Sequence, residues 1–402
     1  MNFLLKVLSL LLFSMVSLSA TSLGNLIENA LLNHPSLQVI KERILSTDKS
    51  ILLSRKFSNP KFTFSINDIQ LDDLNNRSIE RMQSSAITLE QKLPYFGKLD
   101  AKEQSARAIK EIQKLSLEDA KALLVSKIKQ SVYRVWELKT LHKIICKFEE
   151  LTQQSIDLST AYTATTSNQH MGIMSATMSL SDLRIKKNRL LQAMEAQYAR
   201  LSYLSAKEVF DVEIELSMPR LFSLKELTKK LENNFTIKAQ ESSVKEAEAV
   251  LKLRDLEHYP DPTIKAGYFY RSSFEDYFSL MVGVPLPIYG NEKLKSQKQR
   301  KKLLERQSAL KNSENKIRSE LEAHYAYMRQ AHITYTILTK ESMPQIEHMF
   351  ELSSSTITAG GDLFKYIDLI KQELRLEEQS ISAVAEFYKH NASIGALLGV
   401  QQ

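Results

Sequence analysis

Apolar and polar residues alternate with a period of two in four short segments of this chain. The segments have the sequences KFTFSI at residues 61–66, AITLEQKL at 86–93, TIKAGYFY at 263–270 and YFSLMVGVPL at 277–286. In a β-strand successive side chains point to opposite faces, so this alternation gathers the apolar residues of each segment on one face. We therefore predict strands at about 60–69, 85–94, 263–271 and 277–287.

The predicted strands carry aromatic residues that suit the boundary between a membrane and water. Such residues form girdles around membrane-spanning sheets. Ordinary hairpins packed on a protein core show the same alternation, so both alternatives stay open at this stage. The aromatic residues are Phe62, Tyr268, Tyr270, Tyr277 and Phe278.

Long stretches with a helical period follow each strand pair. After Gly97 the next glycine is Gly172, and between them apolar residues recur three or four positions apart. We predict long helices at about 98–165 and 291–356. A helix of this length extends for roughly 100 Å at 1.5 Å per residue, which indicates a coiled coil or an extended tube. The first stripe consists of Ile109, Ile112, Ala120, Leu124, Ile128, Val132, Val135 and Leu138.

The phrase that joins strand to helix occurs twice. It is LPYFGK at residues 93–98 and LPIYGN at residues 286–291. Pro94 and Pro287 have no N–H and so end the pairing of a strand. Gly97 and Gly290 permit a tight turn into the helix. The two phrases predict two similar halves related by an internal repeat.

The repeat predicts the domain organisation. Residues 1–20 combine Lys6 with a short apolar run and small residues, which is typical of a cleavable export signal. We expect the first half at 21–210 and the second at 211–402, each ending its long helix in a reversal to a returning helix. These reversals, called tips here, are expected at about 165–178 and 357–364.

Composition and motifs exclude several function classes. The formal charge of +7 is spread along the chain without a basic block, so we expect no nucleic-acid partner. One cysteine, Cys146, cannot form an internal disulfide. The sequence has no HExxH, no G-x-S-x-G and no phosphate-binding loop, and its His and Cys residues lack metal-ligand spacing. We expect neither an enzyme nor a bound cofactor or metal.

Membrane strands would require oligomerisation. Four strands cannot close a barrel, because about eight are the smallest number that do. An open sheet edge in lipid leaves backbone groups unpaired at several kcal/mol each. A dimer would supply eight strands and a trimer twelve.

The chain resembles the TolC-type outer-membrane efflux proteins. The features that carry the resemblance are the export signal, the strand–helix junctions LEQKLPYFGK and VGVPLPIYGN, the second tip AGGDLFKYIDL and the segment EFYKHNASIGALLG, in this order and partly duplicated. The resemblance implies a mainly α fold with a small β part. Helical hairpins would form a periplasmic α-barrel tunnel, and four strands per chain would contribute to the twelve-stranded transmembrane β-barrel of a homotrimer.

The resemblance also implies a function and partners. The protein would be the outer-membrane channel of a tripartite efflux pump, a passive duct surrounded by outer-membrane lipid. Its protein partners would be a periplasmic adaptor and an inner-membrane pump of the RND type. Heavy-metal cations are a candidate cargo class. The alternative is a soluble periplasmic coiled-coil adaptor or scaffold, although the Gly-rich β modules usual in adaptors are missing.

The resemblance implies two sets of functional residues. An acidic ring would constrict the tunnel, and Asp368 matches its inner position, whereas Lys365 stands at the outer one and would change the charge of the ring. An ordinary solvent-exposed Asp368, paired with Lys365 or Lys371, is the alternative. The tips would dock the adaptor through Met171, Gly172, Ile173, Met174, Gly360, Gly361, Asp362 and Leu363, with the tip glycines allowing the reversals.

One group of residues near the first tip has no assigned role. His170, Met171, Met174 and Met178 follow a helical spacing, and thioethers are soft ligands that suit Cu(I) or Ag(I). Packing against a neighbouring helix or an adaptor is the alternative. The sequence does not distinguish the two.

Overall fold

The computed structural model describes residues 22–162, 167–357 and 363–400. The predicted export signal at 1–20 lies outside these residues. Contacts divide the chain into two compact units, one with residues up to 39, 118–234 and from 316 onward, the other with residues 40–117 and 235–315. Each unit takes segments from both predicted halves, so the halves at 21–210 and 211–402 stay a prediction from sequence.

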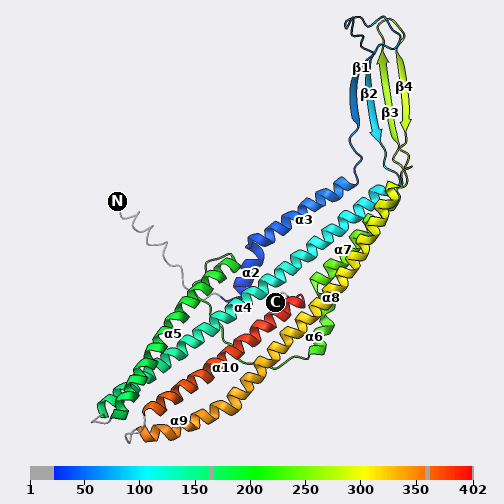
Figure 1. The fold of residues 1–402 in the computed structure, drawn as a ribbon. Helices are drawn as coiled ribbons and strands as arrows, with labels where there is room; N and C mark the ends of the chain where they lie inside the picture. The colour runs from blue at the N-terminus through cyan, green and yellow to red at the C-terminus, as the bar shows by residue number, and fades with distance from the viewer. Residues whose placement is uncertain (1–21, 163–166, 358–362, 401–402) are drawn as a thin grey trace, which may run out of the picture. The chain divides into compact units, whose positions relative to one another are not determined.

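Four antiparallel strands form one sheet in the second unit, in the order β1-β2-β3-β4 (Figure 1). The central pair, β2 and β3, joins one strand from each half of the sequence, and Ile87 of β2 lies opposite Tyr268 of β3. On the other side of β2, Ile87 lies opposite Phe64 of the outer strand β1. The strands are β1 Lys61–Asn67, β2 Ser84–Lys92, β3 Thr263–Tyr270 and β4 Tyr277–Gly283.

The strand ends differ from the predicted ones for local reasons. β4 ends at Gly283, although the alternation continues to about 287, because Pro285 and Pro287 have no N–H for the ladder. β1 ends before Asp68, whose φ of 57° is outside the extended region.

The first long helix has the predicted length. Helix α4 spans Lys98–Tyr162, and its residues Ile128, Val132, Val135 and Leu138 are buried. The apolar stripe is incomplete near its start, since Ile109 is exposed.

The second long helix occupies the predicted range of 291–356, but one turn of it is π-helical rather than α-helical. Helix α8 covers Asn291–Ile337, a π-helical segment covers Leu338–Ser342, and helix α9 covers Met343–Ile357. Pro344 explains the interruption. Its ring cannot donate a hydrogen bond and crowds the carbonyl of Lys340, and a widened turn relieves this.

The remaining helices complete both units. Ser22 caps the first of them by accepting a hydrogen bond from the N–H of Asn25 at 3.3 Å. Pro35 begins the second, a position where its missing N–H costs nothing. They are α2 Leu23–Asn33, α3 Pro35–Ser54, α5 Ser167–Ser205, α6 Leu224–Lys230, the 3-10 segment Leu231–Asn233, α7 Phe235–Leu256 and α10 Leu363–Leu397.

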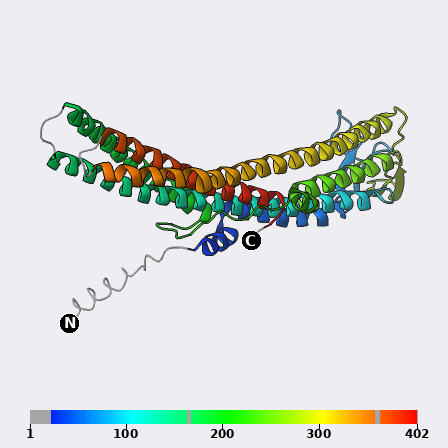
Figure 2. The ribbon, with the colours of Figure 1, turned by 90° about the horizontal axis from the view of Figure 1, so that it is seen from below.

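The core of the first unit lies between α4, α5 and α10. Helix α10 runs beside α9 in both ribbon views, and it also contacts α5 (Figures 1 and 2). Along α10 the residues that enter this core are spaced three or four positions apart. The buried residues are Ile145, Phe148, Ala176, Leu183, Leu363, Ile367, Ile370 and Leu374.

Candidate functional site

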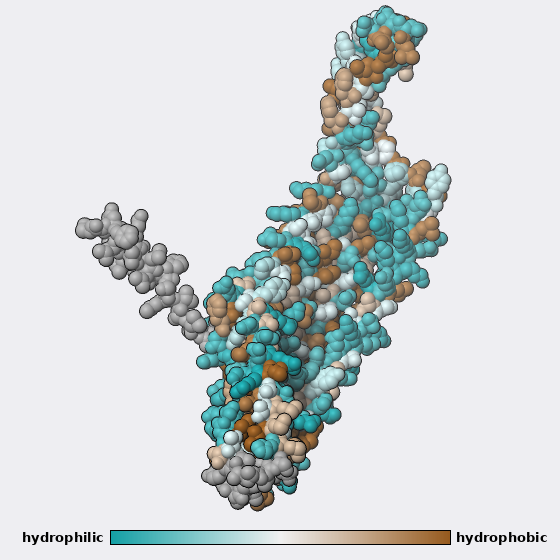
Figure 3. Space-filling model, turned by 60° about the vertical axis from the view of Figure 1, so that its left-hand side comes forward, coloured by the Kyte–Doolittle hydropathy of each residue, from teal (hydrophilic) through white to brown (hydrophobic). Residues whose placement is uncertain are grey.

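One face of the sheet is apolar and exposed. Phe62 and Phe64 of β1 and Phe278 of β4 each expose more than half of their side chain. The register places them on the same face, because Phe64, Ile87, Tyr268 and Phe278 follow one another across the four strands. Figure 3 shows brown residues among teal and white ones over the sheet and its loops. We call the set the apolar sheet face: Phe62, Phe64, Ile66, Ile87, Leu89, Ile264, Tyr268, Tyr270, Phe278, Leu280 and Val282.

The opposite face of the sheet is mainly polar. Lys61, Thr63 and Ser65 of β1 point to it, as do Thr88 of β2 and Ser279 of β4. Burying a large apolar side chain stabilises a protein by about 1.5–3 kcal/mol. A monomer in water would lose this stabilisation for every large apolar side chain of the face. A contiguous exposed apolar surface of this kind marks a contact with lipid or with another protein.

Both predicted strand-to-helix turns contain a glycine in the left-handed region. Gly97 has a φ of 82° and Gly290 a φ of 69°, so a side chain at either position would strain the backbone. Pro94 precedes the first turn and Pro287 the second. These four residues therefore lie where the chain leaves the sheet.

Asp261 fixes the first turn, a role that the sequence pattern does not reveal. Its Oδ1 accepts hydrogen bonds from the N–H of Tyr95 at 2.9 Å and from Lys98 Nζ at 2.6 Å, and its Oδ2 lies 3.2 Å from Lys92 Nζ. Burial raises the pKa of Asp261, but these donors outweigh burial and hold the pKa below its ordinary value. The Tyr95 ring also stacks on Tyr259, with centroids 4.6 Å apart.

Most of the expected first tip at 165–178 is helical, because residues 167–178 already belong to α5. Gly172 lies inside this helix rather than at a reversal. A Cβ on Gly172 would lie 3.3 Å from Leu363 Cβ, so this glycine allows α10 to approach α5. Ile173 is half-buried, whereas Met171 and Met174 are exposed.

The second tip is described only at its end. Gly360, Gly361 and Asp362 lie outside the described residues. Leu363 begins α10 and is buried in the core of the first unit.

The two predicted constriction residues are exposed on α10. Asp368 accepts a hydrogen bond from Gln372 Nε2 at 2.7 Å, one turn further on. Within the described residues no ion pair joins Asp368 to Lys365 or Lys371 within 4 Å, so the pairing considered as an alternative is not formed there. The side chain of Asp368 points away from the core that Ile367 and Ile370 enter.

A pocket of about 210 Å³ lies beside these residues, among α4, α5 and α10. Leu183 and Ile370 line its apolar part, and Asp182, Lys186 and Lys371 line its polar part. Lys186 pairs with Glu378 across the same helices. The pocket has no arrangement of a nucleophile with a base.

Glu137 forms the most buried ionic cluster described in the first unit. Its carboxylate lies 2.9 Å from Lys389 Nζ and 2.8 Å from an Arg134 nitrogen, and it accepts a hydrogen bond from Ser382 Oγ at 3.1 Å. The cluster joins α4 to α10.

Two histidines that are far apart in sequence meet between α8 and α10. His324 Nδ1 lies 3.1 Å from His390 Nδ1, and the Tyr327 ring stacks on His390. Burial lowers the pKa of both imidazoles, and the neighbouring His324 lowers that of His390 further. A neutral pair is therefore favoured near pH 7, in which one ring donates its N–H to the other.

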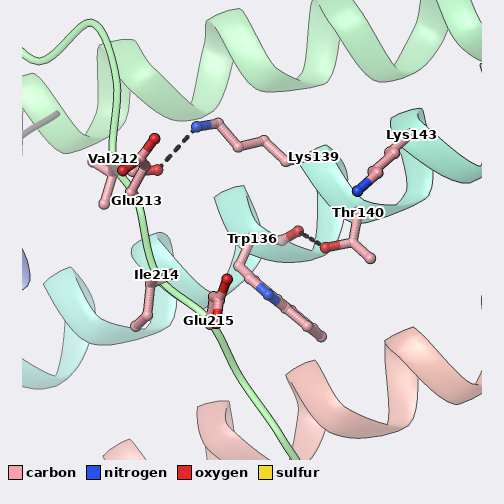
Figure 4. Close-up of a pocket in the computed structure, with 8 residues that line it drawn as sticks. All are labelled: Trp136, Lys139, Thr140, Lys143, Val212, Glu213, Ile214 and Glu215. Carbon is pink, nitrogen blue, oxygen red and sulfur yellow. Dashed lines mark hydrogen bonds between the residues drawn. The ribbon is translucent and has the colours of Figure 1, made fainter.

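A second pocket, of about 730 Å³, is open and of mixed charge (Figure 4). Trp136 and Lys139 come from α4, and Glu213 and Glu215 from the segment that follows α5. Lys139 forms an ion pair with Asp211 and donates to the carbonyl of Val212 at 3.0 Å. These contacts fasten the segment to α4 and show no catalytic geometry.

The described residues contain no cluster of three or more His, Cys, Asp or Glu side chains that could hold a metal ion. Among the helices described, none is long and apolar enough to cross a membrane.

No protein-family model matches the chain, and no curated protein matches it in sequence. Solved structures do match. The outer-membrane protein VceC of Vibrio cholerae superposes with a TM-score of 0.78 at 13% identity, covering 94% of this chain and 96% of that chain. The MtrE outer-membrane channel of Neisseria gonorrhoeae, in its open state, gives 0.77 at 14% identity, with 94% and 88% covered. CusC, described as forming a transmembrane channel, gives 0.75 at 13% identity, with 94% and 91% covered.

These matches establish the fold over nearly the whole described chain. The chain has the fold of solved outer-membrane channels, mainly helical with four antiparallel strands. The predicted fold class is confirmed at this level.

Proposed function

We propose that this protein is the outer-membrane channel of a tripartite efflux system. It carries substrate passively and catalyses no reaction. The observation that supports the proposal most strongly is the apolar sheet face, exposed opposite a polar face, in a chain with the fold of outer-membrane channels. Lipid would cover the apolar face, and the polar face would line an aqueous path.

The sheet also supports the proposed homotrimer. β1 and β4 are the outer strands of the four-stranded sheet, each paired on one side within the chain. Lipid tolerates no open edge, so neighbouring copies would pair through these strands. A trimer would provide the twelve-stranded transmembrane β-barrel expected from sequence.

The soluble adaptor or scaffold is less well supported. Such a protein needs no exposed apolar sheet face, and the matched channels cover 94% of this chain. The mass of the protein purified in detergent, together with its conductance in a planar lipid bilayer, tests the proposal. We expect a homotrimer that conducts ions. A stable monomer or dimer, or a trimer without conductance, would overturn it.

The helix ends suggest where the proposed partners bind. A periplasmic adaptor would contact the tips, and an inner-membrane pump of the RND type would deliver the cargo, with heavy-metal cations as the candidate class. Met171 and Met174 are exposed there and available for contact.

Gly172 offers a test of the tip. Gly172→Val should abolish export while trimers remain in the membrane, because the added side chain would push α10 away from α5 at Leu363. Overpacking of this kind costs about 1–3 kcal/mol. Export assays and membrane fractionation measure the two effects.

Gly172→Ala is the matched control. Its single methyl group needs a shift of a few tenths of an ångström, and alanine favours the helix by about 0.5–1 kcal/mol over glycine. Normal export by Gly172→Val, with or without Gly361→Val, would contradict the role of the tip.

Asp368 tests the constriction. Three copies around an axis would form a negative ring that favours cations. Asp368→Asn keeps the size of the side chain and removes its charge, so we expect lower cation selectivity and weaker block by trivalent cations from the periplasmic side. Single-channel recordings in planar bilayers measure both quantities.

The control for this variant is Asp157→Asn on α4. Asp157 is exposed and accepts a hydrogen bond from Gln153 Nε2 at 2.9 Å, the same type of pair as Asp368 with Gln372. Equal effects of the two substitutions, or none at Asp368, would show that Asp368 does not line the constriction.

A further inference from the structure

Three methionines lie on one exposed face of α5. The residues Met171, Met174 and Met178 are 67%, 68% and 71% exposed. Successive residues of an α-helix are rotated by about 100°, which places these three within an arc of about 60°. His170 is exposed as well and extends that arc to about 100°. The four residues form the methionine face.

The methionine face lies opposite the packed side of the helix. Gly172, Ala176 and Leu180 are buried on the side of α5 that enters the core. Methionine usually fills irregular gaps in a core. In the described structure these three do not, so packing within the chain does not account for them.

The spacing brings the sulfur atoms within reach of one ion. Residues three and four apart on a helix have Cβ atoms about 5–6 Å apart. Met171 and Met174 are three apart, and Met174 and Met178 are four apart. Because a methionine side chain has three rotatable bonds, the sulfurs can converge without a change in the backbone. His170, four residues before Met174, can add an imidazole nitrogen.

Thioether ligands select the class of ion. Soft sulfur donors prefer Cu(I) to hard cations such as Mg²⁺ or Ca²⁺, and Ag(I) is a soft monovalent ion of the same kind. The exposed carboxylate of Asp182, four residues after Met178, adds negative charge near a bound cation. We propose that His170, Met171, Met174 and Met178 form a surface site for a soft monovalent cation, Cu(I) or Ag(I).

This site deepens the proposed function and rests on it for its role. If the tips are the entrance of the duct, the site would hold the cargo transiently before it enters. An exposed site formed by neutral thioethers suits transient binding, because it is neither enclosed nor locked by other groups. The candidate cargo class is then narrowed to soft monovalent cations.

Binding can be measured on the purified full chain in detergent. Cu(I) under anaerobic reducing conditions is partitioned between the protein and a chromophoric Cu(I) chelator, and Ag(I) competes for the same site. We expect one ion per chain. Zn²⁺ should compete only weakly, because it takes three or four thiolate, imidazole or carboxylate ligands and the site offers a single imidazole among thioethers. In methyl NMR spectra of labelled methionines, bound Cu(I) should shift the signals of Met171, Met174 and Met178 and leave the other methionine signals unchanged.

The variant M171L/M174L/M178L removes the sulfurs and keeps the apolar surface. Its affinity for Cu(I) should fall by about 100-fold or more, since loss of groups that only orient metal ligands already costs 10- to 100-fold. The matched control is M194L/M343L/M349L, which removes three methionines elsewhere in the first unit and should bind as the unmodified protein does.

Two results would overturn the site: equal Cu(I) affinity in both triple variants, or no bound ion in the unmodified protein. In the second case, loss of adaptor binding in M171L/M174L/M178L would assign the face to protein docking. If the protein binds Cu(I) but conducts no ions, the proposed channel is refuted and the proposed Cu(I) site stands. If it conducts ions but binds no Cu(I), the site is refuted and the channel stands.

Discussion

Phe64→Lys is expected to prevent stable insertion of the protein into lipid. Phe64 lies in the middle of β1, on the apolar sheet face, opposite Ile87. A lysine on the lipid side near the middle of a membrane strand costs about 2–4 kcal/mol. A homotrimer would carry three such lysines. The measurement is the urea dependence of folding into lipid vesicles, followed by the heat-dependent mobility of the protein on gels.

Ser65→Lys is the control, one residue further along the same strand. Ser65 points to the polar face, where a lysine would meet water. We expect its effect on folding to stay within about 0.5 kcal/mol, as for ordinary surface substitutions. If both variants fold into vesicles equally well, the apolar sheet face is not in contact with lipid.

The strands could be predicted because period-two alternation is strong where one face is apolar. The alternation correctly groups Phe62, Phe64 and Ile66 on one face. It does not show where pairing stops, because Pro285 interrupts the ladder while the apolar pattern continues. It also leaves unanswered what covers the apolar face, since strands packed on a core show the same alternation. Exposure in the structure distinguishes these cases.

For the helices, too, some features could be predicted from the sequence and others could not. The absence of glycine predicted the length of α4 well. The same reasoning placed the helix at 291–356 correctly but did not reveal its π-helical turn, where Pro344 alters the hydrogen bonding. The long-range role of Gly172 was also hidden, since its closeness to Leu363 depends on how two helices pack.

Charged and titratable contacts were the least predictable features. His324 and His390 appeared as scattered histidines, and no local signal pairs residues this far apart in sequence. Asp261 stands before Pro262 without a local signal of its role, yet it fixes the turn at Tyr95 and Lys98. Such contacts depend on which helix faces meet, and a single sequence does not specify that.

The buried cluster around Glu137 leads to the second large expected effect. Lys389→Met should lower the free energy of unfolding by about 3 kcal/mol, because removing one partner leaves a buried carboxylate with less compensation. The Glu137 side chain is only 4% exposed, and Arg134 and Ser382 remain as its partners, which keeps the loss at the low end of the usual range. Fluorescence of Trp136, the only tryptophan of the chain, reports unfolding beside this cluster.

Lys147→Met separates a buried ion pair from an exposed one. Lys147 also joins α4 to α10, through Glu377 at 3.7 Å, but 57% of its side chain is exposed. An exposed pair contributes at most about 1 kcal/mol, so this variant should unfold almost as the unmodified protein does. A further variant, Glu137→Leu with Lys389→Met, should recover most of the loss, since it removes the charge that Lys389→Met leaves buried. If Lys389→Met and Lys147→Met unfold alike, the Glu137 cluster does not hold α4 to α10.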